Sequence, residues 1–333
     1  MSLSRFLDLA DLAPEEIRDL LALAERLQQH PEPQALAGKI LGLIFLNPSL
    51  RTLASMQAGM ARLGGSSFVI TPGQGTWALE TRSGVAMDGD AAEHIREGLP
   101  VLASYCDALG IRAFAAGRDL AMDVADTSFK AMAELIQKPL INLESAINHP
   151  CQSLADWKTL DDLRIAPRTK FVLSWVPHPR ALPLAVPAAT AHMAALRGHD
   201  VVVLRPDGFA LPSPVMDRVH AAAKLSGGSV TETDDRVAAL KGAHIVYAKE
   251  WGSTRHYGDA DGDGALRRHL SDWQLNEQSF ANATPNCKLM HCLPVRRNVA
   301  VAEALLDSPR SVVLHEAHNR LVVQMAVLYR LLK

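Results

Sequence analysis

The sequence predicts an α/β fold with two domains, each a parallel sheet flanked by helices. Short apolar runs of strand length alternate with amphipathic helical segments along the chain. Continuous apolar runs of this kind are typical of strands buried on both faces of a parallel sheet. The alternation forms two series that break near residues 150–167, and a chain of 333 residues is long enough for two ordinary domains.

The first series begins with a helix at Pro14-Glu15-Glu16, because proline suits the first turn and acids suit the positive end of the helix dipole. A buried strand at 40–46 then leads into a helix at 52–63, which Gly64-Gly65 ends. The same reasoning predicts further strands at 67–70, 108–113 and 139–143, and further helices at 93–106 and 127–137.

The second series predicts another parallel sheet, followed by a final apolar helix at 321–332. Residues 259–264 are polar and rich in glycine, so we expect a mobile loop there. The expected strands are 169–176, 200–204, 243–248, 288–291 and 311–315, and the expected helices are 184–196 and 215–225.

Composition excludes several classes of protein. A formal charge of −2 argues against a nucleic-acid binder that relies on bulk charge. No apolar run approaches the ~20 residues that span a bilayer, and residues 1–11 do not resemble a signal peptide. The four cysteines form no CxxC pair, which disfavours a disulfide framework or a zinc site. We therefore expect a cytoplasmic protein.

Motifs for nucleotide and hydrolase chemistry are also missing from the sequence. It contains no GxGxxG after a strand, no GxxxxGK[ST], no GxSxG and no HExxH. Since parallel α/β domains bind ligands beyond the carboxyl ends of their strands, candidate residues are sought there.

The first buried strand runs into Asn47-Pro48-Ser49-Leu50-Arg51-Thr52, and a helix follows. Backbone N–H groups at a helix start, two hydroxyls and one guanidinium together form a suitable cradle for a phosphate group. The alternative is a hydroxyl residue that caps the helix beside a surface arginine.

Three other strand ends carry polar or cationic groups. Arg112 ends one strand, and either an anion or a structural salt bridge would explain it. Glu144 precedes His149-Pro150-Cys151-Gln152, where the histidine could equally be structural. The segment His291–Asn298 contains the adjacent arginines Arg296 and Arg297. Convergence of four such strand ends predicts a small ligand with several negative charges.

Three motifs resemble the signatures of the aspartate/ornithine carbamoyltransferase family: Ser49-Leu50-Arg51-Thr52, His149-Pro150-Cys151-Gln152 and His291-Cys292-Leu293-Pro294. They occur in the family's order, and the resemblance covers the whole chain. It implies a carbamoyl-phosphate domain at 1–150, an amino-acid domain at 151–318, and a C-terminal helix at 319–333 that packs back on the first domain. It also implies a homotrimer with shared active sites and no cofactor or metal. Leu53 departs from the pattern, since the family usually has a second arginine there.

Other segments resemble the branch of the family that acts on N-acylated ornithines. Lys249-Glu250-Trp251-Gly252 stands where the ornithine enzymes carry a Ser-Met-Gly stretch, so free ornithine is not the expected substrate. Trp77, Met87-Asp88-Gly89-Asp90 and His178-Pro179-Arg180 are similar to the N-acylornithine branch.

Two positions point to a succinyl rather than an acetyl group. The acetyl branch of the family, as the resemblance implies, has a glutamate shortly after Asp-Gly-Asp, where this chain has Ala92. It also has a lysine shortly after the Arg-Arg-Asn stretch, where this chain has Ala300. A glutamate would repel the extra carboxylate of succinylornithine by roughly 3 kcal/mol at ~5 Å and an effective dielectric near 20. We therefore expect N-succinylornithine as the substrate, with N-acetylornithine as the alternative.

The resemblance also implies a role for each site residue. The amine must be neutral to attack, and the family stabilises the reaction by preorganised electrostatics. Arg180 is a further candidate for the succinyl carboxylate, although it could equally be a surface charge. The implied catalytic residues are Arg51, Thr52, Arg112 and His149; the implied carbamoyl-phosphate contacts add Ser49, Leu50, Trp77, Gln152, Cys292, Leu293 and Arg320; the implied acylornithine contacts are Glu144, His178, Lys249, Arg296 and Ala92.

Two readings from other classes compete with this one. A binding or regulatory homologue without activity is favoured only by Leu53, and the retained site residues argue against it. A nucleotide-dependent oxidoreductase shares the α/β pattern but would need the glycine fingerprint that the chain lacks.

Overall fold

The computed structural model describes residues 3–333, which divide into two compact units. The first unit contains residues up to Ala115, then Asp126–Leu154 and Arg320–Lys333. The second unit contains Ala116–Ala125 and Ala155–Asn319. The chain therefore enters the second unit briefly at 116–125 before it crosses for the long stretch.

The first unit is built on a five-stranded sheet in which every neighbouring pair is parallel. The buried central strands of this sheet are the apolar runs of the sequence, as a sheet covered on both faces requires. The strand order is β1 (Arg5–Phe6), β7 (Leu140–Glu144), β6 (Ala108–Arg112), β2 (Ile40–Phe45) and β3 (Ser66–Ile70).

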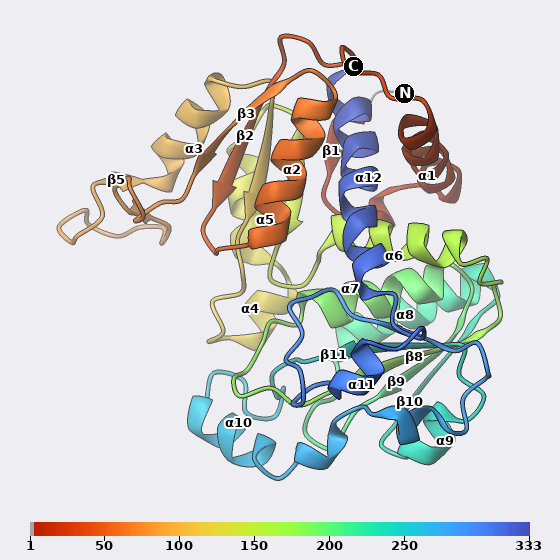
Figure 1. Cartoon of the computed structure of the whole chain (residues 1–333). Coiled ribbons are helices and arrows are strands. Elements are labelled where there is room, and N and C mark those ends of the chain that lie inside the picture. The colour runs from red at the N-terminus through yellow and green to blue at the C-terminus, as the bar shows by residue number, and fades with distance from the viewer. Residues whose placement is uncertain (1–2) are drawn as a thin grey trace. The chain divides into compact units, whose positions relative to one another are not determined.

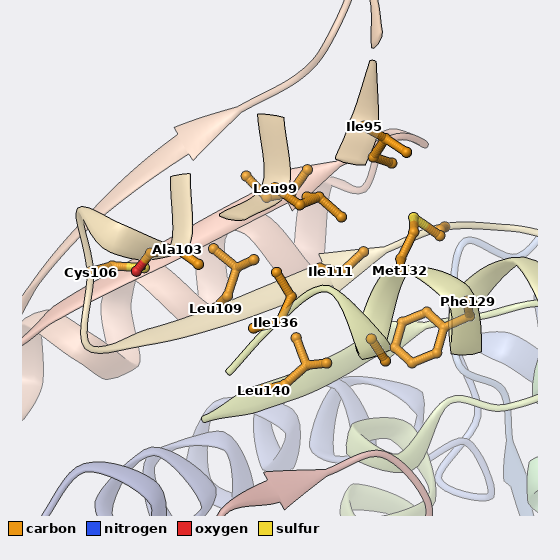
Figure 2. Packing of buried hydrophobic residues seen from close by; sticks show 13 residues of the cluster. Ile95, Leu99, Ala103, Cys106, Leu109, Ile111, Phe129, Met132, Ile136 and Leu140 are labelled. Carbon is orange, nitrogen blue, oxygen red and sulfur yellow. The ribbon is translucent and has the colours of Figure 1, made fainter. Parts of the chain in front are cut away.

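One face of this sheet packs against helices α3 (Ile95–Ser104) and α5 (Thr127–Glu134). Figure 2 shows Leu99 of α3, Leu109 of β6 and Phe129 of α5 in this cluster. Packing is so close that a Cβ on Gly42 of β2 would lie 2.7 Å from Leu109 Cδ1 and 3.1 Å from Cys106 Sγ. Any larger residue at this point of β2 would therefore require these side chains to shift.

Helices also pack in the first unit around α2 (Leu50–Arg62), which follows β2. A Cβ on Gly59 of α2 would lie 3.4 Å from Met325 and 3.6 Å from Leu321, both of α12 (Val313–Leu332). Figure 1 shows this part of α12 beside α2, with α1 (Pro14–Gln29) near the same helix. A small parallel ribbon, β4 (Leu79–Glu80) with β5 (Glu93–His94), extends from the sheet.

The second unit contains another five-stranded sheet with only parallel pairs. Its strand order is β10 (Ser229–Thr233), β9 (Asp200–Leu204), β8 (Lys170–Trp175), β11 (Ile245–Lys249) and β12 (Lys288–Met290). Its helices are α4 (Leu120–Val124), α7 (Ala185–Leu196), α8 (Ser213–Ser226), α9 (Arg236–Leu240), α10 (Ala260–Arg267) and α11 (Glu303–Leu306), with most of α6 (Pro150–Asp162) and the start of α12. The predicted α/β fold with two helix-flanked parallel sheets is confirmed.

Each sheet has one point where the direction of strand addition reverses. In the first unit, β3 lies on one side of β2 and β6 on the other. In the second unit, β9 lies on one side of β8 and β11 on the other. Connections diverge at such a point and leave a crevice beyond the carboxyl ends of the two strands, where α/β proteins bind ligands.

Some expected elements are wrong. In the predicted strand at 311–315, only Ser311 makes a bridge, to Leu289, and α12 already begins at Val313. A short apolar run does not distinguish a strand from a buried helix start, so the pattern was ambiguous. The final helix consequently starts before residue 321. Similarly, Glu93–His94 forms β5, and α3 begins only at Ile95.

The expected mobile loop at 259–264 is also wrong, because α10 begins at Ala260. Asp259 caps this helix, since its Oδ1 accepts a hydrogen bond of 2.9 Å from Gly262 N. The helix ends with the buried Arg267, which is ion-paired to Asp263. The glycines had suggested a flexible segment, but the cap and the buried pair stabilise a helix. Within residues 3–333, no helix is long and apolar enough to cross a membrane.

Candidate active site

The start of α2 lies at the reversal point of the first sheet, directly after β2. Ser49 caps the helix: its Oγ accepts a hydrogen bond of 3.3 Å from Thr52 N and donates one of 3.0 Å to Thr52 Oγ1. Thr52 is buried and Leu50 is 79% exposed. The capping interpretation is thus confirmed. Capping is also compatible with an anion at this helix start, where the N–H groups and the dipole favour negative charge.

Arg320 reaches the same point from α12. Its Nη2 donates a hydrogen bond of 2.7 Å to Thr52 Oγ1, and the residue is buried. A cation in this position adds to the positive end of the α2 dipole. The motif residue Thr52 is therefore held between its own cap and an arginine from near the C-terminus.

Arg112 ends β6, the strand on the other side of the reversal point. Its Nη1 is hydrogen-bonded to Glu144 Oε2 at the end of β7, and both side chains are buried. The guanidinium carbon lies 4.5 Å from the centre of the Phe114 ring. A salt bridge, the alternative for Arg112, is present. The Nε of Arg112 has no hydrogen-bond partner among the described residues, so one donor remains for a ligand.

His149 is a neutral side chain among these charges. Burial lowers its pKa well below the ordinary value, and the positive charges of Arg320, Arg112 and Arg51 lower it further. Its Nε2 lies 3.5 Å from Glu144 Oε2, and its Nδ1 has no partner among residues 3–333. A neutral imidazole can donate one hydrogen bond to an oxygen without adding charge.

The cluster of Arg51, Arg112, Arg320, Glu144 and His149 carries an excess of positive charge, because three guanidiniums face one carboxylate. The pKa of Arg320 is lowered by burial and by the neighbouring Arg112 and Arg51, which shows that these cations act on one another. Buried like charges are costly unless an anion compensates them. The cluster is therefore suited to a small ligand with more than one negative charge.

The second motif continues into α6, where Cys151 and Gln152 are both buried. Burial raises the pKa of the Cys151 thiol to about 12. The thiol stays protonated at neutral pH and is not a nucleophile. In this motif, His149 and Gln152 rather than the cysteine are therefore the candidates for contact with a ligand.

Trp77 and Ala92 lie at the ribbon of β4 and β5. Trp77 is 61% exposed, and its Nε1 donates a hydrogen bond of 2.9 Å to Glu93 Oε2. Ala92 is exposed and directly precedes β5. The indole N–H is therefore used within the exposed ribbon.

In the second unit, Lys249 ends β11 at the reversal point of that sheet. Its Nζ lies 3.0 Å from Glu250 Oε2, and His291 Nε2 lies 3.1 Å from the same oxygen. Burial raises the pKa of Glu250, but the charge of Lys249 and the hydrogen bonds with Lys249 and His291 outweigh this, and the net pKa is well below its ordinary value. Leu293 N donates a hydrogen bond of 2.8 Å to His291 Nδ1, which fixes the segment of Cys292 and Leu293.

His178 follows β8, the neighbouring strand. Its Nδ1 lies 2.9 Å from Arg180 O, and its Nε2 accepts a hydrogen bond of 2.9 Å from Arg296 Nε. A proton on Nδ1 satisfies both contacts, and Arg180 N, 3.0 Å from the same Nδ1, then has no lone pair there to accept its hydrogen. The structure thus brings together His178 and Arg296, two of the residues that the sequence analysis assigned to acylornithine. The side chain of Arg180 is exposed.

Sequence reasoning did not assign a role to Glu250 or His291 side chains. Both are fully buried ionisable residues, Glu250 directly after Lys249 and His291 at the end of β12. The only available signal was their position at strand ends.

The fold and the first cluster define a class of protein: an α/β protein suited to bind a small anion beyond the strands of a parallel sheet. Residues 4–162 match the carbamoyl-P binding domain of aspartate/ornithine carbamoyltransferases, and residues 186–331 match their Asp/Orn binding domain. The chain belongs to the aspartate/ornithine carbamoyltransferase family and is a carbamoyltransferase. These matches argue against the oxidoreductase alternative.

Similar proteins place the chain in the N-acylornithine branch of this family. It is 37% identical to the N-acetylornithine carbamoyltransferase of Xanthomonas campestris pv. campestris, over 98% of this chain and 97% of the relative. It is also 37% identical to the N-succinylornithine carbamoyltransferase of Bacteroides thetaiotaomicron, over 89% of this chain and 88% of the relative. Identity therefore does not separate acetyl from succinyl.

Solved structures agree with this placement. Acetylornithine transcarbamylase complexed with acetylcitrulline matches with a TM-score of 0.95 and 35% identity, over 99% of this chain and 100% of the other. Variants of N-acetyl-L-ornithine transcarbamylase in which one glutamate is replaced have been solved with carbamyl phosphate and N-succinyl-L-norvaline; the alanine variant matches with a TM-score of 0.94, 36% identity and the same coverage.

Proposed function

We propose that this carbamoyltransferase acts on N-succinylornithine in arginine biosynthesis. It would transfer the carbamoyl group of carbamoyl phosphate to the side-chain amine and release N-succinylcitrulline and phosphate. The observation that carries the proposal is the buried cluster at the reversal point of the first sheet, where Arg51, Arg112 and Arg320 surround the neutral His149. This arrangement suits a phosphate with an adjoining carbonyl group.

The phosphate would bind at the start of α2, where Ser49–Thr52 supply N–H groups and Arg51 and Arg320 supply charge. The carbonyl oxygen would face Thr52, Arg112 and His149, which could donate hydrogen bonds to it. These donors are already in place, so charge that develops on the oxygen is stabilised without reorganisation. Trp77, from a neighbouring subunit of the proposed trimer, would close over the phosphate.

The chemistry then follows from the bound groups. The neutral side-chain amine attacks the carbonyl carbon, and the tetrahedral intermediate places negative charge on the oxygen that the donors face. The carbon–oxygen bond to phosphate breaks, phosphate leaves with that electron pair, and the proton that the nitrogen loses passes to the departing phosphate. Gln152 and the backbone carbonyls of Cys292 and Leu293 would orient the carbamoyl NH2 group.

The second cluster would hold the amino acid. His178, Lys249 and Arg296 would bind the carboxylate end, and Glu144 would also contact this substrate. In the domain arrangement that we propose, residues 1–150 bind carbamoyl phosphate and residues 151–318 bind acylornithine. The helix 319–333 completes the first domain with Arg320.

Ala92 supports succinyl over acetyl. A succinyl group ends in a carboxylate, which a glutamate at this position would repel by roughly 3 kcal/mol at ~5 Å and an effective dielectric near 20. N-acetyl-L-ornithine transcarbamylase variants in which one glutamate is replaced by Pro, Ala, Ser or Val were solved with N-succinyl-L-norvaline, so loss of one acid is compatible with a succinyl ligand in that protein. N-acetylornithine remains the second candidate, favoured by the 98% coverage of the acetyl relative.

The test compares initial rates with N-succinylornithine and N-acetylornithine at saturating carbamoyl phosphate. We expect the succinyl substrate to have the higher kcat/KM. Ala92→Glu should lower kcat/KM for the succinyl substrate about 100-fold and leave the acetyl substrate within about threefold, since only the former carries the extra charge. Ala91→Glu is the matched control, with the same charge one residue earlier. A wild-type preference for acetylornithine would refute the succinyl assignment.

A second test concerns Arg112. Arg112→Gln should lower kcat by about 100-fold or more, because a charged donor to the carbonyl oxygen is lost while the shorter amide can still hydrogen-bond Glu144. Turnover is measured by phosphate release with acylornithine present, and a urea unfolding curve shows whether the variant remains folded. A folded variant with unchanged kcat would remove Arg112 from the mechanism.

A further inference from the structure

A buried ion pair in α10 has no role in the reaction described above. Asp263 and Arg267 are 4% and 6% exposed, and Arg267 Nη2 is ion-paired with an Asp263 carboxylate oxygen one helical turn away. Burial lowers the pKa of Arg267 to about 10, so it stays charged at neutral pH. Two charges buried this deeply contribute little net stability, so the pair calls for another explanation.

Arg267 stabilises the segment that follows β8 and contains His178 and Arg180. Its Nη1 donates a hydrogen bond of 2.9 Å to Arg180 O, the same carbonyl oxygen that lies 2.9 Å from His178 Nδ1. Because Arg296 Nε donates to Nε2, the proton of the neutral histidine is on Nδ1, where it is donated to that carbonyl in preference to the contact of 3.0 Å with Arg180 N. The guanidinium of Arg267 therefore fixes the acceptor that orients His178, and His178 in turn orients Arg296.

Asp263 stabilises the segment that follows β11 and contains Ser253. Its Oδ1 accepts a hydrogen bond of 2.7 Å from Ser253 N, and Ser253 Oγ donates one of 2.7 Å to Gly208 O. The segment that Asp263 fixes begins at Lys249 and Glu250. One ion pair thus connects the segments beyond β8 and β11, the two strands at the reversal point of the second sheet.

We infer that Arg267 and Asp263 are positioning residues for the amino-acid substrate. Neither side chain would contact the substrate. Instead, the ion pair fixes the position of the loop with His178, and of its partner Arg296, relative to the loop that begins at Lys249. This inference rests on the proposed function, in which these side chains bind the carboxylate end of acylornithine. It predicts that disturbing the pair weakens binding of the amino acid and leaves carbamoyl-phosphate binding unaffected.

The test variant is Arg267→Met combined with Asp263→Leu. Replacing both buried charges by apolar side chains avoids leaving one charge unpaired, so the protein should remain folded. We expect KM for acylornithine to rise between about 10-fold and 100-fold, while KM for carbamoyl phosphate changes less than about twofold. Arg267→Lys keeps a donor for Arg180 O and should lie between wild type and the double variant. Arg268→Met, the exposed neighbour, is the matched control and should behave as wild type.

A crystal structure of the double variant provides a readout independent of turnover. We expect the hydrogen bond from Arg296 Nε to His178 Nε2 to be lost in it. An intact hydrogen bond, or equal effects on both KM values, would overturn the positioning role. If the wild-type protein used no acylornithine but the variant lost the hydrogen bond, the proposed function would be wrong. Arg267 and Asp263 would still be shown to position His178 and Arg296.

Discussion

At the scale of single residues, His199 shows how burial fixes a protonation state. Its Nδ1 lies 3.0 Å from Thr169 Oγ1, and its Nε2 lies 2.8 Å from Arg197 Nη1. Burial lowers the pKa of His199 to about 4, with a further contribution from the charge of Arg197. The neutral form is therefore the one that the fold requires.

This shift predicts a dependence of stability on pH. The unfolded chain takes up a proton near pH 6.5 and the folded chain only near 4, so the stability present above pH 6.5 is lost as pH falls. Between pH 7 and pH 5 the loss from His199 should be about 2 kcal/mol. Urea unfolding of wild type and His199→Gln at both pH values measures it, and the variant should lose that much less.

The exposed His220→Gln of α8 is the control for this measurement, because an exposed histidine has no buried neutral form to preserve. An equal pH dependence in wild type and in His199→Gln would contradict the assignment.

Residue-level reasoning from the sequence identified side chains by their positions at strand ends. Thr52, Arg112 and His149 were found in this way, and the structure brings them to one cluster. The partners of these residues were not predictable. Arg320 Nη2 meets Thr52 Oγ1 across 268 residues of sequence, and Glu250 meets His291 across 41. No local pattern encodes contacts of that kind, because tertiary packing alone creates them.

At the scale of elements, Gly42 of β2 lies where the side chains of neighbouring residues leave no space for a Cβ atom. Gly42→Ala should destabilise the protein by about 1–3 kcal/mol, because the added Cβ would overpack the layer formed with Leu109 and Phe68. The urea unfolding midpoint measures this loss. Gly89→Ala is the control, since a Cβ at Gly89 meets nothing within 4 Å. Equal midpoints for the two variants would show that the β2 layer relaxes around a methyl group.

The elements that the sequence predicted well are the long, buried ones. Continuous apolar runs located β2, β6, β7, β8, β9 and β11 because both faces of these strands are covered. Strand β10 was missed because it is partly exposed and rich in serine and threonine. Helix α10 was missed because its two glycines resemble a loop, while the buried contacts of Asp263 and Arg267 that stabilise it are tertiary.

At the scale of the whole molecule, two α/β units were predictable from two alternating series. The sequence did not predict that the segment Ala116–Ala125 belongs to the second unit. Asp123 fixes it: its carboxylate accepts hydrogen bonds from Ala116 N and Gly117 N, and one of 2.7 Å from Tyr257 OH, which lies 134 residues away. These contacts are tertiary, so no pattern along the chain indicates that the segment 116–125 belongs to the second unit.

The bond between Thr52 and Arg320 has a consequence for how the protein is made in the cell. A ribosome completes α2 long before α12, so most of the first unit emerges without the arginine and without the helix that covers Gly59. During most of synthesis, the anion-binding cluster lacks one of its cations, and the apolar face of α2 has no partner from α12. A nascent chain should therefore lack its full affinity for phosphate until Arg320 has emerged, and premature termination before Arg320 would yield a product in which α2 lacks the contacts with α12.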